Sequence, residues 1–193
     1  MRRPRRLIGP AGMGGMVGLW GVSSLIKSVQ RGTISTTAAS ATATIAAVDV
    51  ANTILVYNGM TQTQVNNNWS VGQGKVVLTD ATTVTGSIYT NIGTAVWSYE
   101  VIEFLPGIVK SVQAGTITLY GTAPYTATIT AVNTSKTACM FLGYTMASEL
   151  TPATDRATRI ELTASTTVTA TYIEAPPDPQ TINIASYRVV EFY

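Results

Sequence analysis

The sequence contains no histidine and a single cysteine, Cys139. Histidine is the commonest general base and the commonest metal ligand, so its absence removes the usual centre of both kinds of site. One thiol cannot form a disulfide within the chain, and we expect Cys139, in the apolar run TACMFLG, to pack as a small buried side chain. No nucleophile, base and orienting group can be assembled. We therefore expect a protein that is not an enzyme, with no catalytic, cofactor-binding or metal-binding residues.

Charge and long apolar runs are scarce as well. Charged residues make up 11% of the 193 residues, about half the usual share, and the mean hydropathy is +0.23. No apolar run approaches the roughly 18 residues that a membrane helix needs, so we expect no membrane partner. The abundant Thr, Val and Ile are β-branched and suit half-buried pleated sheets. The composition predicts an all-β protein whose low-charge exterior favours burial in an assembly.

Several segments of the sequence occur twice in the chain. KSVQRGTI at residues 27–34 returns as KSVQAGTI at residues 110–117, an offset of 83 residues. The match continues in three further segments, which pair 42–59 with 126–143, 76–87 with 160–171 and 98–104 with 186–192. This offset is too long for a solenoid repeat, and only two copies exist. We therefore interpret the repeating unit as a whole domain that has been duplicated.

Within each unit a two-residue hydrophobic period predicts about six strands separated by short polar turns. In the first unit Gly32 is a candidate β-bulge, and TILVYNG at residues 53–59 is expected to be a central strand buried on both faces. The short connector LPGI should hold the two units close together. We predict two tandem antiparallel β-sandwich domains of immunoglobulin-like architecture, at residues 25–105 and 106–193.

Residues 1–24 match nothing in the second unit and form a predicted extended arm. Six glycines disfavour helix and strand, yet the segment is apolar and begins with an arginine cluster. A secretory signal and a start without a role are alternatives, but we favour an arm that orders against a neighbouring subunit. The cluster could neutralise phosphates, although the rest of the chain is not basic and nucleic acid is not the expected partner. The candidate anchoring residues are Arg2, Arg3, Arg5, Arg6, Leu7, Ile8, Met13, Met16, Leu19 and Trp20.

Two further groups of polar residues are candidates for function. Residues 58–74 form the stretch richest in Asn and Gln, a candidate recognition loop that contains Asn66, Asn67, Asn68 and Trp69. The closing strands carry Glu100 and Glu103 in the first copy, and Arg188 and Glu191 at the same positions in the second. Because only one carboxylate of the pair recurs, we expect charges at a sheet edge or rim rather than acid–base catalysis. Glu103 and Glu191 are expected to bind lysines or backbone groups.

The order IKSVQRGTI, TATITAVNTSKT, ELTASTTVTAT and SYRVVEF resembles that of small β-rich structural proteins of tailed bacteriophages. The resemblance covers about residues 26–193, in both copies, and it rests on a pattern of strands rather than on a site motif. It implies a component of the virion and transfers no catalytic residues.

Three hypotheses for function follow. The first is a minor capsid or decoration protein on the virion exterior, anchored by its arm to major capsid or other virion proteins and expected to be a homo-oligomer. The second is a tail, baseplate or fibre protein whose loops, residues 58–74 and 175–180, bind a host-surface glycan or protein. The third is a secreted bacterial adhesin module. Symmetry, copy number and the choice between capsid and tail are left open by the sequence.

Overall fold

The structure is a computed structural model that describes residues 25–63, 74–89, 93–119, 123–145, 158–172 and 183–193. These residues form twelve β-strands and short 3₁₀-helices, and no α-helix occurs among them. The all-β prediction is therefore confirmed. The predicted arm, the four residues Asn66–Trp69 and the loop at residues 175–180 lie outside the described residues.

We call residues 25–105 the first half and residues 106–193 the second half. The described part of each half contains six strands, as predicted, and one 3₁₀-turn that precedes its third strand. The first half contains β1 (Ile26–Thr36), β2 (Ser40–Thr44), η2 (Val50–Asn52), β3 (Thr53–Gln62), β4 (Gly74–Asp80), β5 (Thr83–Ile88) and β6 (Ala95–Phe104). The second half repeats this order with β7 (Val109–Leu119), β8 (Tyr125–Thr128), η4 (Thr134–Lys136), β9 (Thr137–Thr145), β10 (Thr158–Ala164), β11 (Thr167–Tyr172) and β12 (Asn183–Phe192).

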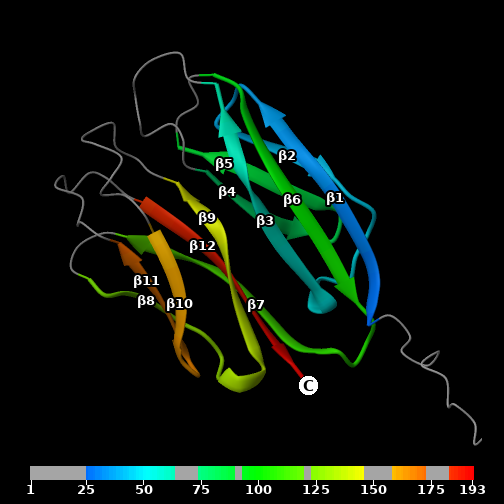
Figure 1. Ribbon diagram of the computed structural model, residues 1–193, viewed down its shortest axis with the longest axis vertical. Coiled ribbons are helices and arrows are strands. Elements are labelled where there is room, and N and C mark those ends of the chain that lie inside the picture. Colours follow the sequence, from blue (N-terminus) through cyan, green and yellow to red (C-terminus); the bar gives the residue numbers. More distant parts are fainter. Residues whose placement is uncertain (1–24, 64–73, 90–92, 120–122, 146–157, 173–182) are drawn as a thin grey trace, which may run out of the picture.

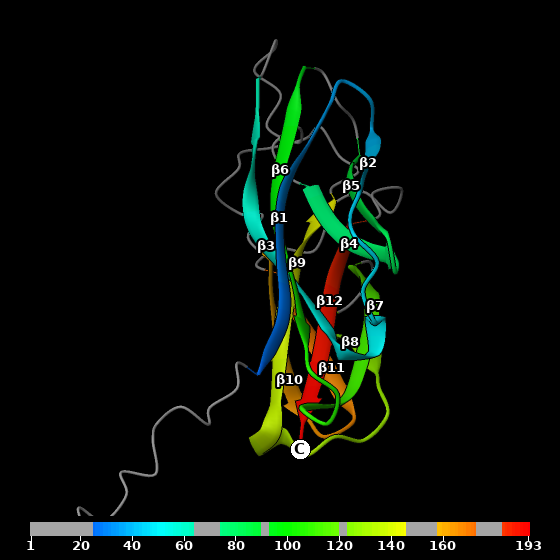
Figure 2. The same cartoon turned by 90° about the vertical axis from the view of Figure 1, so that its right-hand side faces the viewer.

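The strands form three antiparallel sheets, one of which contains strands of both halves (Figure 1). Two sheets have three strands each, in the orders β1-β6-β3 and β10-β11-β8. The third has six strands in the order β2-β5-β4-β9-β12-β7. Its two parts join where Lys75 of β4 pairs with Gly143 of β9. Seen from the side, the chain is narrow and elongated, with the sheets of both halves running along its length (Figure 2).

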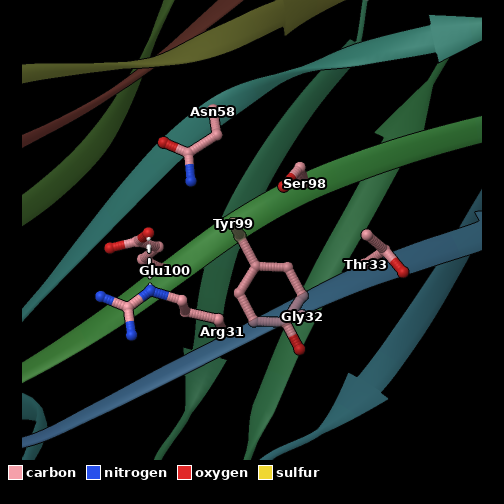
Figure 3. A pocket seen from close by; sticks show the side chains of 7 residues that line it. All are labelled: Arg31, Gly32, Thr33, Asn58, Ser98, Tyr99 and Glu100. Carbon is pink, nitrogen blue, oxygen red and sulfur yellow. Dashed lines mark hydrogen bonds and ion pairs between the residues drawn. The ribbon is translucent and has the colours of Figure 1, made fainter.

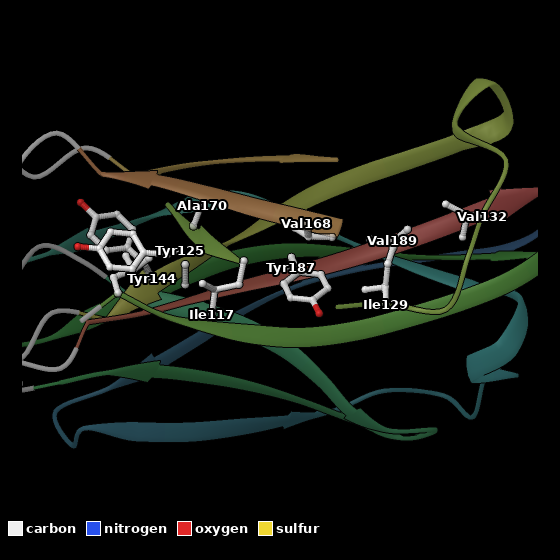
Figure 4. Close-up of a cluster of buried hydrophobic side chains, with 11 residues drawn as sticks. Ile117, Tyr125, Ile129, Val132, Tyr144, Val168, Ala170, Tyr187 and Val189 are labelled. Carbon is white, nitrogen blue, oxygen red and sulfur yellow. The ribbon is translucent and has the colours of Figure 1, made fainter. Parts of the chain in front are cut away.

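Each half has its own cluster of buried apolar side chains between facing sheets. In the first half the cluster surrounds Trp97, and it lies between β1-β6-β3 and β2-β5-β4. In the second half it surrounds Tyr187 and Val168 (Figure 4). Because alternate residues of β6 are buried, this strand has one face toward the core and one face away from it.

The repeated sequence produces repeated close contacts. The ring of Tyr99 lies against Gly32, where a Cβ would be 2.5 Å from the tyrosine Oη. The ring of Tyr187 lies against Gly115 in the same way. The register of β1 on β6 is continuous through Gly32, so the predicted bulge at this glycine is wrong. Glycine is needed here to leave room for the tyrosine ring.

The expected central strand at residues 53–59 is also placed differently. These residues begin β3, which forms one edge of the sheet β1-β6-β3, and they alternate between buried and half-buried positions up to Val56. The prediction of a strand is confirmed, but the prediction of a central strand buried on both faces is wrong. The apolar side chains that face away from the core, such as Ile54 and Val56, lie on a partly open surface.

Candidate functional site

The outer faces of two equivalent sheets are the candidate functional surfaces of this protein. The first outer face is the side of β1-β6-β3 that points away from the first-half core. The second outer face is the equivalent side of β7-β12-β9. Their central residues occupy the same positions in the repeat: Ser98, Glu100, Ile102 and Asn58 on the first face, and Ser186, Arg188, Val190 and Leu142 on the second.

The second outer face is covered by the first half, and Arg188 lies at the centre of this junction. The side chain is 2% exposed and belongs to β12, which has a neighbouring strand on both sides. Its Nε and Nη2 donate to the carbonyl oxygen of Thr53 at 3.1 and 2.9 Å, and Nη2 also donates to the carbonyl oxygen of Val50 at 3.1 Å. The guanidinium therefore binds the backbone of η2 and the start of β3 across the junction.

The expectation that Arg188 is an edge or rim charge is therefore wrong. Burial lowers the pKa of Arg188 to about 10, because the charged form has lost most of its water. The arginine remains protonated at neutral pH, and the carbonyl oxygens replace the water that it lost. A hollow of about 390 Å³ lies beside it, lined from both halves by Val50, Ala51, Leu78, Val112, Ala114 and Arg188.

Leu142 and Gly143 of β9 form the other contact region of the junction. Leu142 is 2% exposed and belongs to the apolar cluster of the first half, although it is a residue of the second. Gly143 has a φ of +92°, and a Cβ there would meet the carbonyl oxygen of Gly74 and lie 2.8 Å from the Cα of Lys75. The two halves therefore approach through backbone at Gly143 and through an inserted apolar side chain beside it.

The first outer face carries the same positions but no covering element from the described residues. Ser98, Glu100 and Ile102 are half-buried, whereas their equivalents Ser186, Arg188 and Val190 are fully buried. Asn58 is exposed at the position where Leu142 is buried. Among the described residues, the same surface of the repeat is therefore covered in one half and open in the other.

The open face is hollowed around the pair Arg31 and Glu100 (Figure 3). Arg31 Nε donates to Glu100 Oε1 at 2.9 Å, across the β1–β6 pair where these two residues are opposite each other. The hollow has a volume of about 330 Å³ and is lined by Arg31, Gly32, Thr33, Asn58, Ser98, Tyr99 and Glu100. In the second half the opposed residues are Ala114 and Arg188. Both faces thus carry a guanidinium at this level of the ladder, but from different strands.

A second hollow lies beside the first, along the edge strand β3. It has a volume of about 260 Å³, and Asn58 and Ser98 line both hollows. Its other lining residues are Gly59, Met60, Thr61 and Val96. The equivalents of Met60 and Thr61 in the second half, Tyr144 and Thr145, are buried. The open surface therefore extends from β1 across β6 to the edge of β3.

The two recurring carboxylates, Glu103 and Glu191, have matching structural partners. Glu103 Oε1 accepts from Lys27 Nζ at 2.8 Å and from the backbone N–H of Asp49 at 2.9 Å. Glu191 Oε1 accepts from Lys110 Nζ and the N–H of Asn133 at the same two distances. The expectation that these carboxylates bind lysine and backbone is confirmed.

The electrostatic balance at these two carboxylates favours the ionised form. Burial opposes ionisation of Glu103, but hydrogen bonds from Lys27, Asp49 and Ser28 outweigh it and lower its pKa. Hydrogen bonds from Lys110 and Asn133 lower the pKa of Glu191. Each carboxylate joins the first strand of its half to the residue that caps the following 3₁₀-turn. Their role is to fix the loop before η2 and before η4.

The remaining titratable groups add no reactive cluster within the described ranges. Cys139 is half-buried against the second-half core, and burial raises the pKa of its thiol, which disfavours the reactive thiolate. Among the described residues no group of three or more Cys, Asp or Glu side chains could hold a metal ion. No helix in the described part of the chain has the length and apolar character needed to cross a membrane.

The structure tests only part of the sequence-based list of functional residues. The anchoring residues of the arm and the recognition residues Asn66–Trp69 lie outside the described ranges, so both predictions stand untested. Sequence reasoning missed the junction residues Arg188 and Leu142. The available signal was the mismatch between the two copies at these positions, where the first copy has Glu100 and Asn58.

Comparisons with family models, with curated proteins and with solved structures find no match to this chain.

Proposed function

We propose that this chain is a structural component of a tailed-phage virion, a minor capsid or decoration protein built from two tandem β-sandwich domains of immunoglobulin-like architecture. The observation that carries the proposal is the junction between the halves. One copy of the repeated unit binds the other through the outer face of a sheet, with Arg188 and Leu142 specialised for that contact. The unit therefore functions as a building block that associates through its sheet surface.

The chemistry of the described residues supports an assembly role. The buried charged side chains all have structural partners. Glu103 and Glu191 bind lysines and backbone amides, and Arg188 binds backbone carbonyls. The sequence adds the low-charge composition and the resemblance to phage structural proteins. The arm at residues 1–24 is proposed to anchor the protein to neighbouring virion proteins. Burial of its apolar residues would contribute about 25 cal/mol for each Å² removed from water.

The copy number of the protein in purified particles tests this proposal. A decoration protein should be present in hundreds of copies per virion by quantitative gel analysis. A count between about six and eighteen would instead favour the tail, baseplate or fibre alternative, because tail structures have low rotational symmetry. Absence from particles would overturn the virion assignment, and export with cleavage near residue 20 would favour the adhesin alternative.

Removal of the arm tests its anchoring role separately. A chain that begins at residue 25 should fold, with the β-sheet circular dichroism of the full chain, but should fail to join particles. The control is the full chain added to the same particles at equal concentration. Full incorporation of the shortened chain would contradict the anchoring role of the arm.

A further inference from the structure

We propose that the first outer face binds a second copy of this chain. It would bind the copy's tail surface, which we define as η4 together with the outer edge of β10. The first outer face is thus the head of each molecule, and chains would join head to tail. Each contact between molecules would repeat the junction that already exists between the two halves of one chain. The inference rests on the proposed structural role, and it names the partner of one surface.

The strand edges needed for this contact exist in the two different halves of the described molecule. Within one chain, the edge of β4 meets β9 at Lys75 and Gly143. The equivalents of these residues are Arg159 on β10 and Gly59 on β3, and both strands end their sheets. Gly59 keeps the positive φ of Gly143, at +109°, yet a Cβ there would meet nothing within 4 Å. The backbone at Gly59 therefore has the conformation used at the junction, and no described residue fills the space where a Cβ would lie.

Residues of the tail surface are also less buried than their equivalents in the first half. Thr53, whose carbonyl accepts from Arg188, is fully buried, whereas its equivalent Thr137 is half-buried. Val76 of β4 is fully buried, and its equivalent Ile160 of β10 is half-buried. We attribute these differences to the junction, since the second half covers β4 and η2, whereas no described residues cover β10 and η4 in the same way. A second copy placed on the tail surface would remove them.

The charges of the two surfaces complement each other. In the existing junction a guanidinium donates to the carbonyls at positions 50 and 53. The equivalent carbonyls belong to Thr134 and Thr137, and Arg31 carries the guanidinium on the first outer face, held by Glu100. Lys136 lies between Thr134 and Thr137 in the sequence and is exposed. A copy docked in the same register would place Lys136 near Glu100 and Arg31 near the carbonyls.

The apolar part of the first outer face fits a weaker version of the same contact. Val29 is 36% exposed, and Ile54, Val56 and Ile102 are half-buried on this face. However, Asn58 stands where the second face inserts Leu142 into the neighbouring core. The contact between chains should therefore be reversible and salt-dependent, unlike the permanent junction within the chain. Because head and tail are different surfaces, association continues to a ring or an open series.

Sedimentation of the full chain at increasing concentration tests the proposal. We expect oligomers larger than dimers to form between about 1 μM and 1 mM, the range of weak reversible contacts. Two variants break opposite ends: Arg31→Ala removes the head guanidinium, and Lys136→Glu places a like charge opposite Glu100. Each alone should weaken self-association about tenfold, the effect of losing about 1.4 kcal/mol. An equimolar mixture should restore association up to heterodimers, because one intact head can still bind one intact tail.

A gain-of-function variant keeps the test independent of folding defects. Asn58→Leu gives the first outer face the apolar residue of the second and keeps Glu100 opposite Lys136, and it should tighten association about tenfold. Adding Lys136→Glu tests whether the tightened contact uses the tail surface. Association that is unaffected by this addition would overturn the proposed partner surface.

Other outcomes are equally decisive. A wild-type chain that stays monomeric throughout, a series that stops at symmetric dimers, or mixed variants that fail to form heterodimers would each contradict the inference. These results leave the virion assignment intact, since that depends on the presence of the protein in particles. Conversely, head-to-tail association of a protein absent from particles would overturn the virion assignment alone.

Discussion

The first and second outer faces share a fold and most of a sequence, yet they differ in what covers them. Arg188 and Leu142 are each 2% exposed under the first half. Their equivalents Glu100 and Asn58 lie on an open, hollowed surface. A few substitutions therefore separate a surface that is fixed to its neighbour from one that no other described element covers. The duplicated chain provides its own reference, because each residue of one face can be exchanged for its counterpart on the other.

Exchange of Arg188 should have the largest effect. Arg188→Glu gives the second face the first-face residue and places a carboxylate against the carbonyls of Thr53 and Val50. We expect the free energy of unfolding in urea to fall by roughly 3–5 kcal/mol, as for a broken buried charged contact. The matched exchange, Glu100→Arg, should change it by no more than about 1 kcal/mol because the site is partly open. Similar losses for the two variants would contradict the assigned difference between the faces.

Exchange of Leu142 should have the next largest effect. Leu142→Asn removes an apolar side chain from the first-half core and introduces an amide without a partner there. We expect a loss of roughly 2–4 kcal/mol in the same denaturation experiment. The reverse exchange, Asn58→Leu, should leave the stability of the monomer within about 0.5 kcal/mol, measured at low concentration. A stable Leu142→Asn chain would show that this residue does not join the two halves.

The paired glycines sharpen the comparison at the backbone. Gly143→Ala and Gly59→Ala incur the same penalty for a positive φ, roughly 1–2 kcal/mol. At Gly143 the added methyl also collides with the backbone of Gly74 and Lys75. Thermal or urea unfolding should therefore show Gly143→Ala to be less stable than Gly59→Ala by about 1–3 kcal/mol. Equal stabilities would mean that β4 and β9 do not approach at this residue.

The two carboxylates should make stability depend on pH in the same direction in both halves. The folded-state pKa values of Glu103 and Glu191 are lowered, so their stabilising contribution is present above the unfolded value of about 4.3 and is lost as pH falls through the folded values. Glu103→Gln should therefore have a lower free energy of unfolding than the wild type near neutral pH. This difference in stability should shrink below about pH 4. The measurement is a series of urea midpoints against pH, with Glu191→Gln as the matched variant. A difference that is constant with pH would exclude ionisation as its cause.

The smallest effect on stability is expected at Arg31. Its ion pair with Glu100 is exposed, and such pairs contribute at most about 1 kcal/mol. Arg31→Ala should therefore leave the urea midpoint of the monomer nearly unchanged. A large destabilisation would show that Arg31 supports the fold, and the residue would then be unsuitable for testing association.

The repeat and the all-β character could be predicted because they depend on local patterns. Matching sequence segments indicated the duplication, and the alternation of apolar and polar residues predicted the strands. The position of β3 could not be predicted in this way, because a continuous apolar run is compatible with a central strand or with an edge strand whose outer face is partly covered. Only the pairing of strands distant in the sequence decides between these arrangements.

The role of Arg188 depended on a contact between the two halves, which no single strand pattern contains. Sequence reasoning recognised that arginine replaced Glu100, but it interpreted the change as the loss of a carboxylate pair. The partners of Arg188 are the backbone carbonyls of Val50 and Thr53. Because every residue has a backbone carbonyl, such acceptors cannot be identified from the sequence. A mismatch between otherwise similar copies is therefore best interpreted as a difference in environment.

Hydroxyl-radical footprinting of Ile102 and Val190, at low and high protein concentration, tests the central claim most directly. These equivalent residues lie on the two outer faces, half-buried and fully buried respectively. At low concentration Ile102 should be modified and Val190 protected, and at high concentration Ile102 alone should gain protection. Equal modification of both residues in the dilute protein would contradict the claim that one face is covered and the other open.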